Sequence, residues 1–250
     1  MNHNLTENPF EKKFHLGTSD CDFRGKWKIS SILDAVQNTS NEQNDRLHIW
    51  HDDLASSNLS WVLCKNEMTL ARIPRLGETV KVTTYTKGVR ALYCPRYCLI
   101  IDENDDIVAR LGSLLMLIDR DTRKAVSPNK IGIEIPDISE VEPAIKISMK
   151  HVAVIGGSFL TKHIPTYTDV DINGHVNNAR YIDWLCNDFG FEYFDQFEIE
   201  YISINYMSEI LPRDVIETEL IISDDKRNFQ YVGRVSEVTA FVIFGKARLK

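Results

Sequence analysis

Residues 169–184 have the sequence DVDINGHVNNARYIDW, and this stretch decides how the second half of the chain is organised. Asp171, Asn173 and His175 alternate with nonpolar residues, so in an extended segment their side chains would project to one side. A carboxylate, an amide and an imidazole would then meet on one short segment. The stretch therefore predicts a catalytic loop.

An amphipathic helix is predicted directly after this loop. Asn177 or Asn178 can cap its start, and Gly190 can end it. A helix N-terminus offers free N–H groups and the positive end of the helix dipole, which suit an acyl oxygen that becomes negative during attack. The apolar positions at helical spacing are Val176, Ala179, Ile182, Leu185, Cys186 and Phe189.

The run D-x-D-x-N-x-H-V-N-N-x-x-Y-I, from Asp169 to Ile182, resembles the signature of plant and bacterial acyl-acyl-carrier-protein thioesterases, which have two tandem hotdog domains. The resemblance implies an α+β fold in which each domain is a long helix wrapped by a curved antiparallel sheet. It also implies hydrolysis of a fatty acyl thioester carried on the phosphopantetheine arm of acyl carrier protein. No metal or organic cofactor is implied.

In that family an acidic residue on the strand following the helix completes the site, in a run similar to residues 205–209 of this chain, which makes Glu209 the match. The resemblance thus implies a catalytic set of Asp171, Asn173, His175 and Glu209. We expect Glu209 to lie in an apolar interior, where burial would strengthen it as a base. Many plant members carry a cysteine next to this residue, whereas Ile210 stands here, which favours direct attack by water. Whether Glu209 or Asp171 takes the proton stays open.

The first half of the chain repeats the pattern of the second. Residues 18–26 precede residues 167–175 by 149 positions and share Asp, Asp and Gly in register. A second echo, 138 positions apart, relates residues 73–75 (Ile-Pro-Arg) to residues 211–213 (Leu-Pro-Arg). Each half therefore repeats the order strand, Asp loop, helix and strands, as tandem hotdog domains require.

The repeat also predicts what the first half has lost. Only Asp22 keeps its counterpart in the catalytic set, and we predict that the first half does no chemistry and shapes the acyl pocket. The basic residues of its loop would meet the acidic carrier or the phosphate of the carrier's arm, or would pair with Asp20 or Asp22. The predicted correspondences are Arg24 with Asn173, Lys26 with His175, and Ala71 with Glu209.

Domain boundaries follow from these patterns. We predict an N-terminal hotdog domain over residues 1–132, a linker over 133–150 that contains two prolines among mixed charges, and a catalytic C-terminal domain over 151–250. The first-half helix is almost wholly polar over 37–46, which predicts a solvent-exposed or partner-facing surface.

Composition limits the classes of function. The 250 residues carry a net charge of −7, which argues against general nucleic-acid binding, although an acidic carrier needs only a local basic patch. The first 25 residues contain no signal-peptide run, and no window reaches the roughly 20 apolar residues of a membrane helix, so we expect a cytoplasmic protein without membrane insertion. Residues that could form the basic patch, or simply a solvated turn, are Arg120, Arg123, Lys124 and Lys130.

Other combinations of residues predict no further site. Five cysteines without a CxxC pair describe neither a disulfide framework nor a zinc site, and Cys94 and Cys98 fit buried positions on one face of a strand. His48 and His51 could share a helical face, but no Asp or Glu pair completes a known metal-ligand spacing with them. No phosphate-binding glycine motif and no G-x-S-x-G nucleophile elbow is present.

The leading functional hypothesis is an acyl-acyl-carrier-protein thioesterase that releases free fatty acid. An acyl-CoA thioesterase is the alternative within the enzyme class, and a hotdog dehydratase is a weaker one. A non-catalytic acyl-binding protein is the alternative outside it, although a pure binder has no need for a base. Either a monomer or a homodimer is consistent with two fused hotdog domains.

Overall fold

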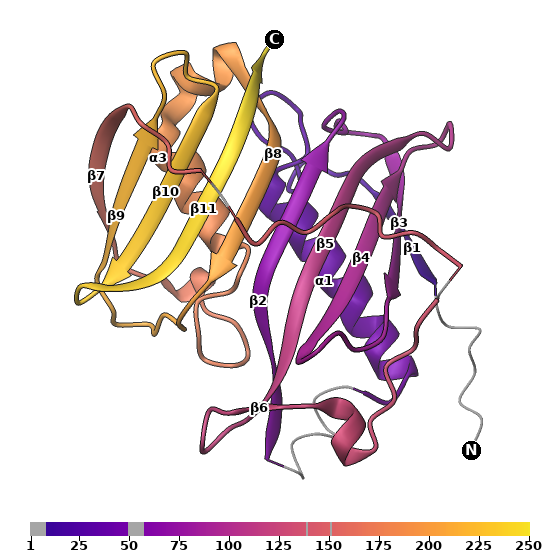
Figure 1. Cartoon of the computed structure of the whole chain (residues 1–250). Helices are drawn as coiled ribbons and strands as arrows, with labels where there is room; N and C mark the ends of the chain where they lie inside the picture. The colour runs from indigo at the N-terminus through magenta and orange to yellow at the C-terminus, as the bar shows by residue number, and fades with distance from the viewer. Residues whose placement is uncertain (1–8, 50–57, 139, 151) are drawn as a thin grey trace. The chain divides into compact units, whose positions relative to one another are not determined.

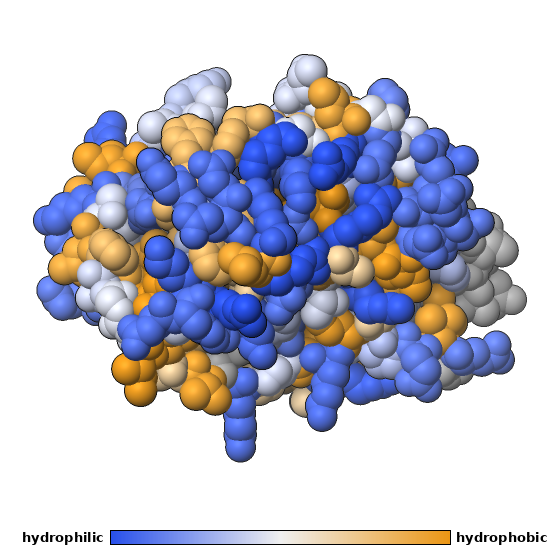
Figure 2. All heavy atoms as spheres, turned by 90° about the horizontal axis from the view of Figure 1, so that it is seen from above, coloured by the Kyte–Doolittle hydropathy of each residue, from blue (hydrophilic) through white to orange (hydrophobic). Residues whose placement is uncertain are grey.

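A computed structural model describes residues 9–49, 58–138, 140–150 and 152–250 (Figure 1). The chain divides into two compact units, Met1–Ile147 and Ser148–Lys250, and this division falls within residues 133–150. Each unit consists of a long helix and an antiparallel sheet, which is the α+β hotdog arrangement. Among the described residues, no helix is both long enough and apolar enough to cross a membrane. The face seen in Figure 2 mixes hydrophilic and hydrophobic side chains.

The first unit is built around helix α1 (Ile29–Arg46), which packs against its sheet. The apolar and β-branched runs of the sequence form the strands, as periodicity predicts. A short 3-10 helix, Pro128–Ile131, follows the last strand. In spatial order the antiparallel strands are β1 (Phe10–His15), β3 (Thr79–Thr86), β4 (Tyr93–Ile101), β5 (Ile107–Asp119) and β2 (Leu59–Leu70), with β6 (Ala125–Val126) paired to β5.

One face of the polar part of α1 is buried at Thr39, Ser40, Gln43 and Asn44, so the prediction of a solvent-exposed or partner-facing surface was wrong for this inward face. The opposite face is exposed at Asn38, Asp45 and Arg46. Arg96 on β4 is 5% exposed, and its guanidinium donates hydrogen bonds to Gln43 Oε1, Asn44 Oδ1 and Thr84 Oγ1, the last at 3.1 Å. No described carboxylate pairs with Arg96, and burial lowers its pKa to about 10. The amide side chains of α1 therefore solvate a buried cation.

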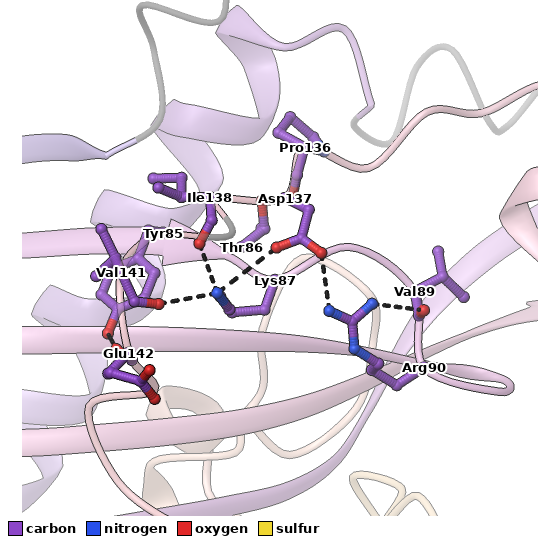
Figure 3. Close-up of polar contacts among 10 residues, drawn as sticks. All are labelled: Tyr85, Thr86, Lys87, Val89, Arg90, Pro136, Asp137, Ile138, Val141 and Glu142. Carbon is purple, nitrogen blue, oxygen red and sulfur yellow. Dashed lines mark hydrogen bonds and ion pairs between the residues drawn. The ribbon is translucent and has the colours of Figure 1, made fainter.

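The segment after the 3-10 helix is tied to the end of β3 (Figure 3). The ammonium of Lys87 donates hydrogen bonds to the carbonyl oxygens of Ile138 and Val141, the latter at 2.8 Å, and lies 3.7 Å from the Asp137 carboxylate. Arg90 forms an ion pair with the same carboxylate at 2.8 Å. Since an ammonium has three donors, Lys87 can hold several turns of an irregular segment at once.

Further along, the same segment packs on the sheet of the first unit. The hydroxyl of buried Tyr85 donates to Glu142 O at 2.8 Å. A Cβ atom at Gly112 on β5 would lie 2.7 Å from the Ile147 side chain and 2.9 Å from that of Ile145, so any larger residue would force these side chains to shift. The predicted linker thus runs over the surface of the first unit.

The second unit repeats the arrangement around helix α3 (Arg180–Gln196). Gly190 has φ 74° and ψ 175°, which interrupts the helix where the sequence predicted its end, and a second helical stretch continues to Gln196. In spatial order the antiparallel strands are β8 (Phe197–Tyr206), β11 (Val238–Leu249), β10 (Asn228–Val235), β9 (Ile216–Ile222) and β7 (Gly157–His163).

Candidate active site

A tight loop between β7 and α3 contains three of the four predicted catalytic residues. The N–H of Asp171 donates to His175 O at 2.9 Å, and the N–H of Gly174 donates to Asp171 O at 3.0 Å. Gly174 has φ 78°, a left-handed conformation that glycine adopts without strain. Val170 and Val176 pair across the neck of the loop. The segment is therefore a closed turn and not the extended run that simple alternation suggested.

The side chains of Asp171 and Asn173 interact directly. Asp171 Oδ1 accepts a hydrogen bond from the backbone N–H of Asn173 at 2.8 Å, and Asp171 Oδ2 accepts one from Asn173 Nδ2 at 3.4 Å. Asp171 is half-buried, whereas Asn173 is exposed. The carboxylate therefore fixes the conformation of the turn and the orientation of the amide.

His175 meets Glu209, which lies beyond the end of β8. His175 Nε2 is 3.7 Å from Glu209 Oε2, and the two side chains are 33% and 37% exposed. The N–H of Val176 donates to Ile210 O at 2.9 Å, which attaches the segment after β8 to the loop. The prediction that Glu209 lies in an apolar interior was wrong, because the buried residue is its neighbour Ile210.

Backbone contacts hold both ends of the loop. Asn177 or Asn178 was expected to cap the helix, but the residue that flanks α3 is Ala179. Its N–H donates to Asn177 Oδ1 at 2.8 Å in the preceding turn. The N–H of Asn177 donates to Asp169 O at 2.8 Å, and the hydroxyl of Tyr206 donates to Asn178 O at 3.2 Å. The loop is therefore tied both to itself and to β8.

The first unit contains the same loop with different side chains. The N–H of Asp22 donates to Lys26 O at 2.8 Å, the N–H of Gly25 donates to Asp22 O at 2.9 Å, and Gly25 has φ 69°. The N–H of Arg24 donates to Asp22 Oδ1 at 2.9 Å, as Asn173 does to its own aspartate. This backbone identity confirms the register of 149 residues.

Arg24 forms an ion pair with Asp22, whereas no described cation pairs with its counterpart Asp171. Arg24 Nη2 lies 2.5 Å from Asp22 Oδ2 and its Nε lies 2.9 Å from the same oxygen, so the guanidinium binds the carboxylate through two donors. Of the two predicted roles for Arg24, pairing within the loop is the one observed.

The second predicted register needs a correction. Pro74 O and Ile210 O accept equivalent hydrogen bonds, at 2.8 and 2.9 Å, from the residue that follows each loop. These two residues are 136 positions apart, so the hydrogen bonds place Ile73, and not Ala71, opposite Glu209. The offset of 138 positions predicted from the Pro-Arg echo was therefore wrong by two residues. Ile73 is buried and offers no base.

Sequence reasoning missed a buried polar cluster in the second unit. Asp188 Oδ2 on α3 accepts hydrogen bonds from Tyr231 at 2.7 Å and Thr218 at 3.1 Å, and lies 3.0 Å from His163 Nε2. The His163 ring stacks on Trp184 with centroids 5.3 Å apart. Burial alone would raise the pKa of Asp188, but the hydrogen bonds from His163 and Tyr231 outweigh it and lower the pKa.

This cluster joins the strand that enters the loop to the helix that leaves it. His163 is the last residue of β7, and Asp188 lies on α3. The available signal was that Asp188 follows Tyr181 and Trp184 at helical spacing, on the face that packs on the sheet.

The remaining candidates gave no second site. Burial raises the pKa of the Cys94 thiol to about 11 and also raises the pKa of Cys98, which fits packing on β4. Within the described ranges, no group of three or more His, Cys, Asp or Glu side chains could hold a metal ion. His51 lies outside the described residues, so its pairing with His48 has no structural counterpart.

Each unit matches a domain of the same known family. Residues 7–135 match the acyl-ACP thioesterase N-terminal domain, and residues 154–245 match the acyl-ACP thioesterase C-terminal domain. The chain belongs to the acyl-ACP thioesterase family. This family assignment agrees with the resemblance carried by the loop motif.

Individual members of the family show how far the similarity extends. A chloroplastic acyl-[acyl-carrier-protein] hydrolase of Cuphea viscosissima is 25% identical over 229 residues, covering 87% of this chain and 56% of that protein. The chain thus spans about half the length of the curated relatives it matches. An acyl-ACP thioesterase from Bacteroides thetaiotaomicron has the same fold, with a TM-score of 0.84 at 20% identity and coverage of 95% and 97%. The 12:0-ACP thioesterase from Umbellularia californica also has a TM-score of 0.84, at 18% identity and coverage of 96% and 97%.

Proposed function

We propose that this chain is a thioester hydrolase that releases free fatty acid from acyl-acyl-carrier protein. The observation that carries the proposal is that Asp171, Asn173, His175 and Glu209 meet at one loop in a chain of the acyl-ACP thioesterase family. Relatives whose names specify hydrolysis of acyl-carrier-protein thioesters support it.

In the proposed mechanism, water attacks the thioester directly. Glu209 or Asp171 takes a proton from the water, and the water oxygen bonds to the carbonyl carbon. The C–S bond then breaks, and the phosphopantetheine sulfur leaves and takes up a proton. Asn173 and His175 orient the water and the thioester. Ile210 excludes a cysteine nucleophile at that position, and the reaction requires no metal or organic cofactor.

The proposed partner is the acidic acyl carrier protein with its phosphopantetheine-linked acyl chain. The basic residues over 120–130 supply a local positive charge on a chain whose net charge is −7. A carrier that meets this charge would bind faster at low ionic strength. An acyl-CoA thioesterase lacks this protein contact and is the alternative.

Turnover on matched substrates tests the proposal. We expect the purified protein to hydrolyse acyl-carrier-protein thioesters, with a lower kcat/KM for the same acyl group on CoA. His175→Ala and Asn173→Ala should each lower kcat by roughly 100-fold or more. An absence of hydrolysis by the native protein across a panel of acyl-chain lengths would contradict the proposed function. Loss confined to KM in both variants would favour an acyl-binding protein.

A further inference from the structure

Tyr181 lies in the first turn of α3, directly after the catalytic loop, and its ring belongs to an aromatic cluster. The residue is 3% exposed. Its ring centroid is 4.6 Å from that of Phe241, 5.6 Å from that of Tyr206 and 5.6 Å from that of Trp184, which it meets edge-on. Packing therefore allows little rotation of the ring and fixes the position of the hydroxyl.

The hydroxyl of Tyr181 forms no hydrogen bond to a described residue. Among the described, non-exposed residues, every fully buried side-chain nitrogen or oxygen has a hydrogen-bond partner. The Tyr181 oxygen must therefore keep some accessible surface although the rest of the residue is covered. Because a buried tyrosine usually satisfies its hydroxyl, this group is available to a molecule that enters the site.

Two carboxylates of the proposed site act on this hydroxyl. Burial raises the pKa of Tyr181, and the negative charges of Asp171 and Glu209 raise it further. The phenol thus remains a hydrogen-bond donor throughout the pH range in which a thioesterase would be assayed. The Tyr206 ring contacts the Tyr181 ring, and its hydroxyl donates to Asn178 O of the loop, so Tyr206 links the Tyr181 ring to the loop.

We propose that the Tyr181 hydroxyl is a catalytic group that donates a hydrogen bond to the attacking water. This inference rests on the proposed thioesterase function and assigns a further residue to it. The carboxylates of Asp171 and Glu209 can only accept hydrogen bonds, so a water held between them uses both of its hydrogens. A donor must then hold one lone pair of the water oxygen, and Tyr181 supplies it. The remaining lone pair is left to attack the carbonyl carbon, while one carboxylate takes the proton.

The thioester oxygen is a poorer partner for this hydroxyl. It becomes negative during attack, and two carboxylates nearby would oppose that charge. The backbone N–H groups of Asn177, Ala179 and Arg180 at the start of α3 already donate within the loop, so the side chains of Asn173 and His175 are the groups left to stabilise it. Tyr181 is therefore assigned to the nucleophile and not to the oxyanion.

A pair of matched tyrosine variants separates catalysis from stability. Tyr193 lies on the same helix, is 8% exposed, and donates a hydrogen bond to Lys226 O at 3.0 Å. Tyr181→Phe should lower kcat by about tenfold or more, leave KM within about twofold, and leave Tm unchanged, because no protein hydrogen bond is lost. Tyr193→Phe should leave kcat unchanged and lower Tm by about 2 to 5 °C.

Binding of a non-hydrolysable substrate tests which oxygen is held. Acyl carrier protein bearing an amide in place of the thioester should bind Tyr181→Phe and the native protein with equal affinity, since the water contact does not hold the acyl group. Weaker binding by Tyr181→Phe would overturn the assignment to water. A fall in kcat of less than about threefold, or a drop in Tm as large as that of Tyr193→Phe, would overturn the catalytic role. The proposed function would survive these results, whereas an inactive native protein would remove both.

Discussion

His175 Nε2 lies 3.7 Å from Glu209 Oε2, a distance that joins the loop before α3 to the segment after β8. This separation exceeds that of a hydrogen bond, and both side chains are about one-third exposed. The two groups are thus close enough to influence each other while each keeps an accessible face for substrate or water. The hydrogen bond from Val176 N to Ile210 O joins the next residues of the same two segments.

In the proposed mechanism these two groups act on the same reacting centre, so their substitutions should not be additive. We expect His175→Gln and Glu209→Gln each to lower kcat by roughly 100-fold or more. The double variant should be little worse than the poorer single variant, since removing one member already disables the unit. The single-turnover rate of acyl-acyl-carrier-protein thioester hydrolysis measures the effect of each variant. Two effects that multiply fully would indicate independent roles.

The equivalent loop of the first unit should be dispensable for chemistry. Lys26 stands opposite His175, and Asp22 is neutralised by Arg24, so neither a neutral imidazole nor a free carboxylate is available there. Lys26→Ala should leave the single-turnover rate of bound substrate nearly intact, with any effect on KM. His175→Ala serves as the matched variant and should abolish the chemical step. Equal damage to the chemical step in both variants would contradict this division of labour.

Local turn chemistry explains why the loops could be predicted from sequence. The Asp and Gly positions at residues 22 and 25 fix the same turn as those at 171 and 174, so matching letters gave the correct register of 149. Glu209 was matched through the family motif, but its exposure could not be predicted, because alternation does not extend beyond the end of β8. The register of residues 73–75 failed because a Pro-Arg pair does not by itself specify hydrogen bonding.

The buried polar groups were beyond sequence reasoning for a different reason. A run such as residues 37–46 has the composition of a solvated helix face, but Gln43 and Asn44 within it are buried against an arginine more than 50 positions away on β4. Asp188 is similar, since its three partners come from β7, β9 and β10. Only tertiary structure brings such donors and acceptors together.

The Arg96 cluster should contribute strongly to stability. Arg96→Met removes the donor shared by Gln43 and Asn44 in a buried environment, so we expect a loss of about 2 to 5 kcal/mol in the free energy of unfolding. Arg110→Met on the neighbouring β5 is the control, because Arg110 is exposed, and it should change stability by less than about 0.5 kcal/mol. Urea unfolding compares the two variants. Similar stabilities would mean that the buried cation is not required by the fold.

Asp188 should make the stability of the protein depend on pH in the acidic range. The pKa of Asp188 in the folded protein lies below the ordinary value near 4. The ionised carboxylate therefore stabilises the fold above that pH, and this stabilisation is lost as the pH falls through the folded pKa. Asp188→Asn should cost about 1 to 3 kcal/mol at pH 7, and the difference from the native protein should shrink below about pH 4. Asp195→Asn, at an exposed position of the same helix, should follow the native curve. Thermal unfolding from pH 2.5 to 8 measures these differences. A difference for Asp188→Asn that stays constant to the lowest pH would show that the charge of this carboxylate is not what holds β7 to α3.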